Sequence, residues 1–497
     1  PGIFLPGGRN GDRFDLISAD GVFCDPQLGC SNRLVVQDLS EEHAWQFSQE
    51  LRISSNFDGP FNFSFGGNVL HYETQENYYV FVNTVTLFAA NIDNGFASRL
   101  WVPGVSDNHE CLMRPRGNGA GGFQYPDPNG GSGALGCDYI DPNPLSSLND
   151  EGHNYFLSQN PYVVNSYAGF GEAYYNVAPD LKFTAGLRFT EDRKHFPLIP
   201  SWLASAGYGY PIVGNVDQDW GKITGRFAAN WTPKLDFTDQ TLIYGSYAHG
   251  YKAGGANPPG PVLPTSVDLQ PTHPLTFAPE YVDAFEIGSK NTLLDGALTL
   301  NGNLFYYNYK GYQISQIVDR TAINLNFDAH VKGAELEATY EPVPGLRFNF
   351  GGGWEHTELA DGSKAVDLMD RTAGHTDWVV VKPDVTLASN CVLPSYLLAE
   401  MIKIGEKIGQ GSIDGGACAG AYVRGVDPVT NKTYVPNPTR TYNNRRITDG
   451  YPGFDPSTAP NGGAGFYKDL SGNELPNAPP FTVSFGAQYS MPVSEDW

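Results

Sequence analysis

Hydrophobic and polar residues alternate most regularly over residues 279–358, in four consecutive segments. Within the second segment, for example, Leu298 and Leu300 alternate with Thr299 and Asn301. Successive side chains of a β-strand point to opposite faces, so each segment would have one apolar and one polar face. The pattern predicts strands at 281–290, 297–315, 329–341 and 346–358.

The same alternation recurs in seven further segments and brings the predicted number of strands to eleven. They are arranged as a hairpin at 44–75, eight strands with their loops at 162–358 and a last strand at 480–491. Short Gly- and Pro-containing turns are predicted near 57–60, 178–181, 233–239, 292–296 and 342–345. Long loops are predicted at 1–43, 76–161 and 360–476, the last with helical spacing at 394–411. Short turns therefore lie at one end of the strands and long loops at the other.

Two fold classes produce this alternation, a soluble β-sandwich and a transmembrane β-barrel. The predicted strands are about 10 residues long or longer, carry aromatic residues near their ends and are joined by short turns at one end only, which is typical of barrels. We therefore predict an all-β, antiparallel transmembrane β-barrel with short periplasmic turns and long extracellular loops.

Composition agrees with this fold class. Only 17% of the residues are charged, whereas Gly (58), Tyr (28) and Phe (29) are abundant. No window of about 18 consecutive apolar residues is present, so no transmembrane helix is predicted. The net charge of −23 argues against nucleic acid as a partner. We attribute it to solvated loops and an acidic lumen, or to attraction of cationic ligands and divalent ions.

Six cysteines fall into three pairs that are close in sequence, and each pair lies in a predicted loop. An even count with local pairing suits disulfides formed in an oxidising compartment. The predicted disulfide cysteines are Cys24 and Cys30, Cys111 and Cys137, and Cys391 and Cys418.

No catalytic constellation is visible. The sequence has no GxSxG elbow, HExxH motif or phosphate-binding loop. Acidic residues at 217–221 and 361–370 are spaced loosely like calcium ligands but lack the later ligands. We interpret five histidines as polar residues of the lumen or the membrane interface: His43, His71, His249, His330 and His356. The sequence thus predicts no enzyme, no cofactor and no metal site.

Charged residues follow the polar faces of the predicted strands. They are Glu50, Arg52, Arg188, Arg226, Glu286, Lys290, Glu335, Glu337 and Arg347. We expect them to face the lumen, either as salt bridges that stiffen the wall or as a docking surface for a plug or ligand.

Six segments, taken in order and spacing, resemble the TonB-dependent outer-membrane receptors, in particular their iron-complex receptor branch. They are SQELRISSNFDGPF, FTAGLRFTED, LIYGSYAHGYKAGGAN, FAPEYVDAFEIGSKNTLLDGALTLNGNLFYYNYKGYQ, VKGAELEATYEPVPGLRFNFGGGW and NAPPFTVSFGAQYS. The resemblance implies a barrel of roughly 22 strands with a plugged lumen. It also implies import of a scarce nutrient, driven by the TonB energy-coupling protein through the plug.

The sequence contains no segment that resembles the plug, the energy-coupling box or the terminal strand of this family. We therefore expect residues 1–497 to be a middle piece of the barrel domain, with about half of its strands. Its expected partners are outer-membrane lipid of a Gram-negative bacterium, an iron–siderophore or similar small ligand, and TonB.

Ligand contacts are expected at the loop end, from aromatic residues and from Arg or Lys that meet anionic oxygens. The candidates are Tyr247, His249, Tyr251, Lys252, Trp202, Tyr208, Arg440, Arg445 and Arg446. Each has an alternative interpretation as an interface aromatic residue or a solvated loop charge. Alternative functions are a passive porin, a soluble all-β binding or adhesion protein, and an outer-membrane hydrolase.

Overall fold

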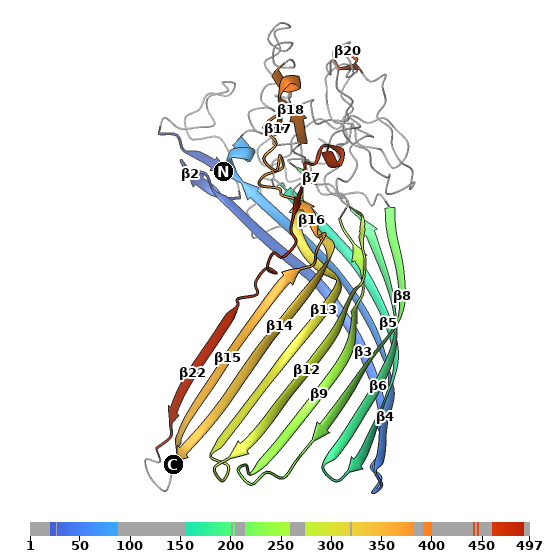
Figure 1. Ribbon diagram of the computed structural model, residues 1–497. Coiled ribbons are helices and arrows are strands. Elements are labelled where there is room, and N and C mark those ends of the chain that lie inside the picture. The colour runs from blue at the N-terminus through green and yellow to red at the C-terminus, as the bar shows by residue number, and fades with distance from the viewer. Residues whose placement is uncertain are drawn as a thin grey trace.

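A computed structural model describes residues 20–25, 27–87, 156–199, 202–203, 214–258, 274–318, 321–381, 391–399, 441–442, 445–446 and 460–491. Eleven long strands form one antiparallel sheet in the order β3-β4-β5-β6-β8-β9-β12-β13-β14-β15-β22. In Figure 1 they lie side by side as a curved wall of tilted strands. The prediction of an all-β antiparallel fold with eleven strands is confirmed. None of the helices in the described residues is long and apolar enough to cross a bilayer.

The long strands have the following bounds: β3 Val36–Ser54, β4 Phe61–Val82, β5 Phe156–Ala178, β6 Leu181–Leu198, β8 Gly214–Trp231, β9 Gln240–Lys252, β12 Glu280–Leu293, β13 Leu298–Val318, β14 Thr321–Val343, β15 Leu346–Leu359 and β22 Phe481–Tyr489. A short strand, β7 (Trp202–Leu203), pairs with β5. Two more short strands, β10 (Gly255–Ala256) and β11 (Thr276–Phe277), pair with each other.

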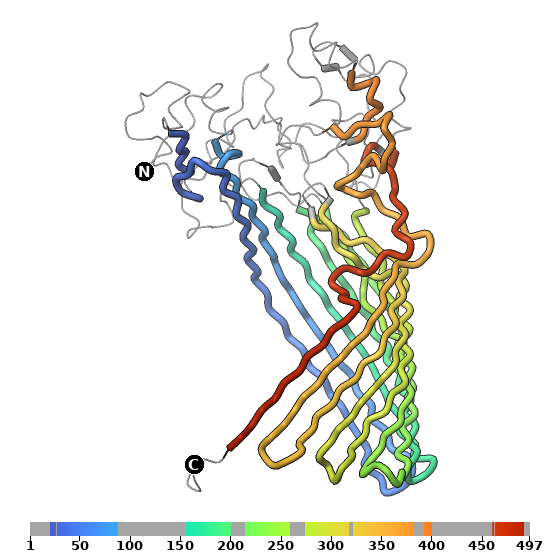
Figure 2. Tube along the Cα trace, turned by 60° about the vertical axis from the view of Figure 1, so that its left-hand side comes forward, coloured from blue at the N-terminus to red at the C-terminus, as the bar shows by residue number. Residues whose placement is uncertain are grey.

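Short turns join the strands at one end of the sheet, which is the lower end in Figure 2. They span 55–60, 179–180, 232–239, 294–297 and 344–345. In two of these turns the backbone takes left-handed angles: Leu294, Asp295 and Gly296 have φ of 59°, 56° and 89°, and Gly345 has φ of 87°. Glycine adopts such angles without steric cost, so Gly296 and Gly345 favour these tight reversals, whereas Leu294 and Asp295 take left-handed angles despite their side chains.

Several strands extend beyond their predicted limits. The hairpin expected at 44–75 spans Val36–Val82, and β5 begins at Phe156. Hydrogen-bonded polar residues occupy one face of these extensions; for example, the Tyr78 hydroxyl donates to Asp38 Oδ2 at 3.1 Å. Alternation of apolar residues does not mark such a segment, so the predicted limits were too narrow.

Short elements lie inside the loops expected at 1–43 and 360–476. They are β1 (Phe23–Asp25), β2 (Gly29–Ser31), β16 (Lys364–Val366), β17 (Trp378–Val381), β18 (Cys391–Pro394), β19 (Thr441–Tyr442), β20 (Arg445–Arg446), the 3-10 turn η5 (Pro460–Gly463) and β21 (Tyr467–Asp469). Of the helix expected at 394–411, residues 395–399 are helical, and the remainder lies outside the described residues.

One face of the sheet is apolar and exposed on every long strand. Its residues include Leu51, Phe65, Tyr167, Leu187, Ile223, Tyr247, Ile287, Leu304, Leu336, Phe350 and Val483. Exposure reaches 70% for Leu51 and 75% for Val483. An apolar surface of this extent is unfavourable in water and requires an apolar environment.

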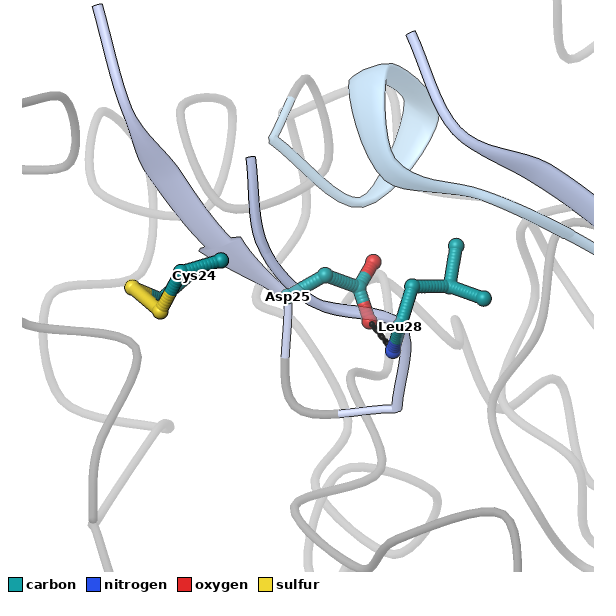
Figure 3. Close-up of a disulfide and its surroundings, with 4 residues drawn as sticks. Cys24, Asp25 and Leu28 are labelled. Carbon is teal, nitrogen blue, oxygen red and sulfur yellow. Dashed lines mark hydrogen bonds between the residues drawn. A yellow bond between two sulfur atoms is a disulfide. The ribbon is translucent and has the colours of Figure 1, made fainter. Parts of the chain in front are cut away.

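A disulfide-closed hairpin covers the upper end of this sheet. Cys24 of β1 is bonded to Cys30 of β2, and Asp25 Oδ1 accepts a hydrogen bond from the Leu28 amide at 2.9 Å (Figure 3). Leu28 packs against a buried cluster that contains Tyr79 and Leu157. Of the other predicted pairs, Cys111, Cys137, Cys418 and the side chain of Cys391 lie outside the described residues.

The segment before β22 folds back over the opposite face of the sheet. Leu475 is 7% exposed and packs with Ala329, Val331 and Leu359 of β14 and β15. Its amide donates to Thr357 Oγ1 at 2.9 Å. This segment therefore lines the polar face at the end with the long connections.

Candidate functional site

The structure places the nine charges predicted to face the lumen on the face opposite to the exposed apolar residues. Each alternates along its strand with that apolar set, as Arg188 does between Leu187 and Phe189. Two of the nine contact each other, since Arg52 Nη2 lies 2.9 Å from Glu50 Oε1. A third, Arg347, has its Nε 3.6 Å from Oε1 of Glu341, which is not one of the nine. We define this surface as the polar face.

The best-connected group on the polar face centres on Glu172, which the sequence analysis missed. Arg226 Nε donates to Glu172 Oε1 at 2.5 Å, and the Tyr174 hydroxyl donates to Glu172 Oε2 at 2.7 Å. Glu172 and Arg226 belong to β5 and β8, which are separated by β6, and Gly186 of β6 pairs with both. Because Gly186 has no side chain, Arg226 reaches across it. No local sequence signal marks this pairing.

Three further contacts link neighbouring strands of the polar face. The Tyr244 hydroxyl donates to Glu286 Oε1, and Lys290 Nζ lies 5.9 Å from the centre of the Tyr244 ring. Asn303 Nδ2 donates to Glu335 Oε2 at 3.0 Å. Cross-strand contacts of this kind stabilise a sheet and give it a polar wall.

Near the long connections, β8 and β9 separate. Their ladder ends at the pair Gly225 and His249, although β8 stays paired with β6 up to Gly214 and β9 with β12 up to Lys252. Side chains bridge the opening. We call this group the seam cluster: Asp192, Lys194, Trp220, Lys222, Tyr251 and Tyr281.

The seam cluster combines lysines with aromatic rings. Lys194 Nζ lies 5.7 Å from the Trp220 ring and donates to the Gly254 carbonyl at 2.8 Å. Lys222 Nζ lies 5.3 Å from the Tyr281 ring, and the Tyr251 and Tyr281 rings are 5.7 Å apart. The Tyr251 hydroxyl is buried and faces the Asp192 carboxylate, with which it makes no well-formed hydrogen bond. A buried polar group in this state can gain a partner from a ligand.

A second aromatic group lies on β13, on the far side of β12. Tyr309 and Tyr312 pack edge to face with their ring centres 5.2 Å apart, because a bulge at Gly311 turns both rings to one side. Gly311 has φ of 67°. Its amide donates to Asp328 Oδ1 at 2.9 Å. The sequence analysis did not name these tyrosines, although a glycine inside a strand is a signal for a bulge.

The predicted ligand residues do not form one site in the described structure. Tyr247 and His249 lie on the apolar face, where both contact Asp283 Oδ1 at 2.8 Å. Tyr251 belongs to the seam cluster. The backbone of Lys252 lies opposite that of Glu280 in the β9–β12 ladder. For three of the remaining candidates only the backbone is described: Trp202, Arg445 and Arg446. The other two, Tyr208 and Arg440, lie outside the described residues.

The histidines interpreted as lumen or interface residues share the face of the exposed apolar residues. Each is separated by an even number of residues from the apolar residues of its strand; they are His43, His71, His249, His330 and His356. His330, for example, stacks on Tyr306, which is 42% exposed. This arrangement favours the interface interpretation over the lumen one. Within the described residues, no group of three His, Cys, Asp or Glu side chains is arranged to hold a metal ion.

A family model described as "TonB dependent receptor-like, beta-barrel" matches residues 18–381. No curated protein matches the chain.

Three solved structures illustrate the structural similarity. The ferric yersiniabactin uptake receptor FyuA of Yersinia pestis is 17% identical, with a TM-score of 0.41, over 67% of this chain and 38% of that one. The siderophore receptor PiuA of Acinetobacter baumannii is 16% identical, with a TM-score of 0.39, over 67% and 41%. The copper transporter OprC is 13% identical, with a TM-score of 0.41, over 65% and 39%. The chain thus spans about two fifths of their length.

Proposed function

Since the chain belongs to the TonB-dependent receptor family through its β-barrel domain, we propose that it is part of an outer-membrane receptor that imports a scarce nutrient, namely a ferric siderophore or a similar iron complex. The apolar face contacts the lipid of the outer membrane of a Gram-negative bacterium. The polar face lines the lumen, and the TonB protein supplies the energy for import.

The seam cluster is the observation that supports a ligand of this class. It offers two lysines and three aromatic rings at the end of the sheet that bears the long connections. Lysines attract the anionic oxygens of iron chelates, and aromatic rings pack on their flat groups. The buried Tyr251 hydroxyl adds a donor that has no protein partner of good geometry.

The first experiment measures uptake of radioactive iron. The receptor is expressed in a strain that lacks its own siderophore receptors, and uptake is measured for a panel of ferric siderophores with and without an uncoupler. We expect saturable uptake that the uncoupler abolishes. Uptake that is unsaturable and insensitive to the uncoupler would support a passive porin, and recovery of the protein outside the membrane fraction would support a soluble binding protein.

The second experiment tests the seam cluster itself. Lys222→Ala removes the cation that lies over Tyr281, and we expect the Kd for the imported complex to rise about tenfold, which corresponds to ~1.4 kcal/mol. Lys182→Ala is the matched control, because Lys182 also covers a tyrosine, Tyr174 at 4.8 Å, but lies at the end with the short turns. Equal Kd values for the two variants would contradict the assignment.

A further inference from the structure

Four aromatic side chains follow one another along β13 on the polar face, and we call them the aromatic row: Phe305, Tyr307, Tyr309 and Tyr312. The first two rings are stacked with their centres 4.9 Å apart, and the last two meet edge to face at 5.2 Å. All four pack against the buried cluster that contains Leu475 but remain partly exposed. The row therefore presents ring faces on the polar side of the sheet.

Four glutamates border the aromatic row, and we call them the border carboxylates: Glu280, Glu286, Glu335 and Glu355. Phe305 lies opposite Glu286 on one side and Gly333 on the other, and Gly333 lies opposite Glu355. A Cβ on Gly333 would collide with Phe305 Cζ, so the ring extends over this glycine towards Glu355. Opposite residues share a face of the sheet, so two carboxylates flank the Phe305 ring.

Neutral groups donate hydrogen bonds to three of the border carboxylates. The donors are the Gln313 amide to Glu280 at 2.8 Å, the Tyr244 hydroxyl to Glu286, and Asn303 Nδ2 to Glu335 at 3.0 Å. Burial raises the pKa of Tyr309, which lies beyond the apolar stripe of β13, and the carboxylates of Glu280 and Glu355 raise it further. The negative charge of the border thus acts on the rings of the row.

The lysines and arginines of β9 and β12–β15 do not balance the border carboxylates. Three of them are engaged or lie elsewhere: Lys310 with Asp328 at 2.8 Å, Arg347 with Glu341 at 3.6 Å, and Lys332 on the apolar face. Two lysines are left, Lys252 opposite the start of β12 and Lys290 near its end. Four carboxylates therefore face two ammonium groups, and the row has a surplus of negative charge.

We propose that the aromatic row binds a protonated amine of the imported iron complex, with the ammonium group on the ring faces and beside the border carboxylates. Aromatic faces attract cations, and carboxylates accept charge-assisted hydrogen bonds from them. The seam cluster lies on the other side of β12 and offers lysines to anionic oxygens. Because β9 and β13 are two strand spacings apart, about 10 Å, one complex can contact both. The inference rests on the proposed function.

The test compares three ferric trihydroxamates with the same iron core and the same chain, which ends in a primary amine, an acetylated amine or a trimethylated amine. Their Kd values for the purified intact receptor are measured by quenching of tryptophan fluorescence. We expect the amine form to bind about tenfold more tightly than the acetylated form, which corresponds to ~1.4 kcal/mol. The trimethylated form keeps the charge at a larger size, so its Kd should be closer to that of the amine form.

Two variants test the residues. Tyr309→Leu removes a ring face, and Glu355→Gln removes a charge while keeping the size of the side chain. We expect each to weaken binding of the amine form about fivefold and to leave the Kd of the acetylated form unchanged. Folding is checked by heat-modifiable gel mobility, and Glu355→Gln keeps the test valid if Tyr309→Leu does not fold.

Two matched controls change the same residue types on the opposite face of the same strands. Tyr306→Leu removes a β13 tyrosine that stacks on His330. Glu358→Gln neutralises a β15 carboxylate that lies 3.4 Å from His356 Nε2. Both are expected to keep the tenfold preference for the amine form.

Equal Kd values for the amine and acetylated forms would overturn the inference. Equal weakening of both forms in Tyr309→Leu and Glu355→Gln would also overturn it, because the row would then only support the fold. If the receptor binds no form and the uptake panel identifies an imported iron complex without an amine, this inference fails and the proposed function stands. If the panel identifies no imported complex, the proposed function itself fails.

Discussion

Gly186 offers the sharpest test of how the polar face is held together. A Cβ at this position would lie 2.8 Å from Glu172 Cγ and 2.9 Å from Glu172 Oε1, and the three nearest atoms all belong to Glu172. Gly186→Ala is therefore expected to push the Glu172 carboxylate away from Arg226 and Tyr174. Glu172→Ala removes the same two contacts by a different route.

The expected loss of unfolding free energy follows from how exposed the two charged side chains are. The side chains of Arg226 and Glu172 are 58% and 23% exposed, so the ion pair contributes near the surface value of about 1 kcal/mol. The hydrogen bond from Tyr174 adds about 1 kcal/mol. Each single variant should lose about 2 kcal/mol of unfolding free energy, and the double variant should lose no more than either one. The coupling energy is then about 2 kcal/mol in magnitude.

The assay is urea unfolding of the receptor reconstituted in lipid vesicles, followed by tryptophan fluorescence for the four proteins of the cycle. Gly169→Ala is the control, because a Cβ there meets nothing within 4 Å. If the two single losses add in the double variant within about 0.5 kcal/mol, Gly186 and Glu172 act independently and the reasoning is wrong.

Three further predictions concern the ends of the sheet. Gly345→Ala forces a side chain into a left-handed turn (φ 87°) and against a backbone carbonyl, so it should lower the unfolding free energy by about 2 kcal/mol or more, measured by urea titration; an unchanged midpoint would contradict this. Replacing Cys24 and Cys30 with serine opens a hairpin of sequence separation 6, which should raise amide exchange there while the sheet core stays protected, with a loss of about 2 kcal/mol. The pKa of Asp367 is held below its usual value, first by the Met369 amide. Its stabilising contribution is thus present above the ordinary aspartate range and is lost as pH falls through the lowered pKa, so acid should increase proteolysis of its loop, and D367N should remove that pH dependence.

The sequence by itself determined the strands and the turns. Apolar and polar residues alternate with a period of two residues in a segment such as 297–309. This pattern alone indicates a strand and shows which residues lie on each of its two faces. The LLDG and PVPG turns are equally local, because each has a glycine at a left-handed position. By the same parity, Tyr247 and His249 continue the apolar stripe of β9, a signal that was present in the sequence but was outweighed by their ligand-like chemistry.

Only the tertiary structure decided which side chains meet. Glu172 and Arg226 are 54 residues apart and touch because the strand between them carries a glycine at the shared row. The seam cluster exists because the β8–β9 ladder stops at Gly225 while the flanking ladders continue. Pairing register and ladder length depend on the energy of whole neighbouring strands, and the pattern within any one strand does not contain them.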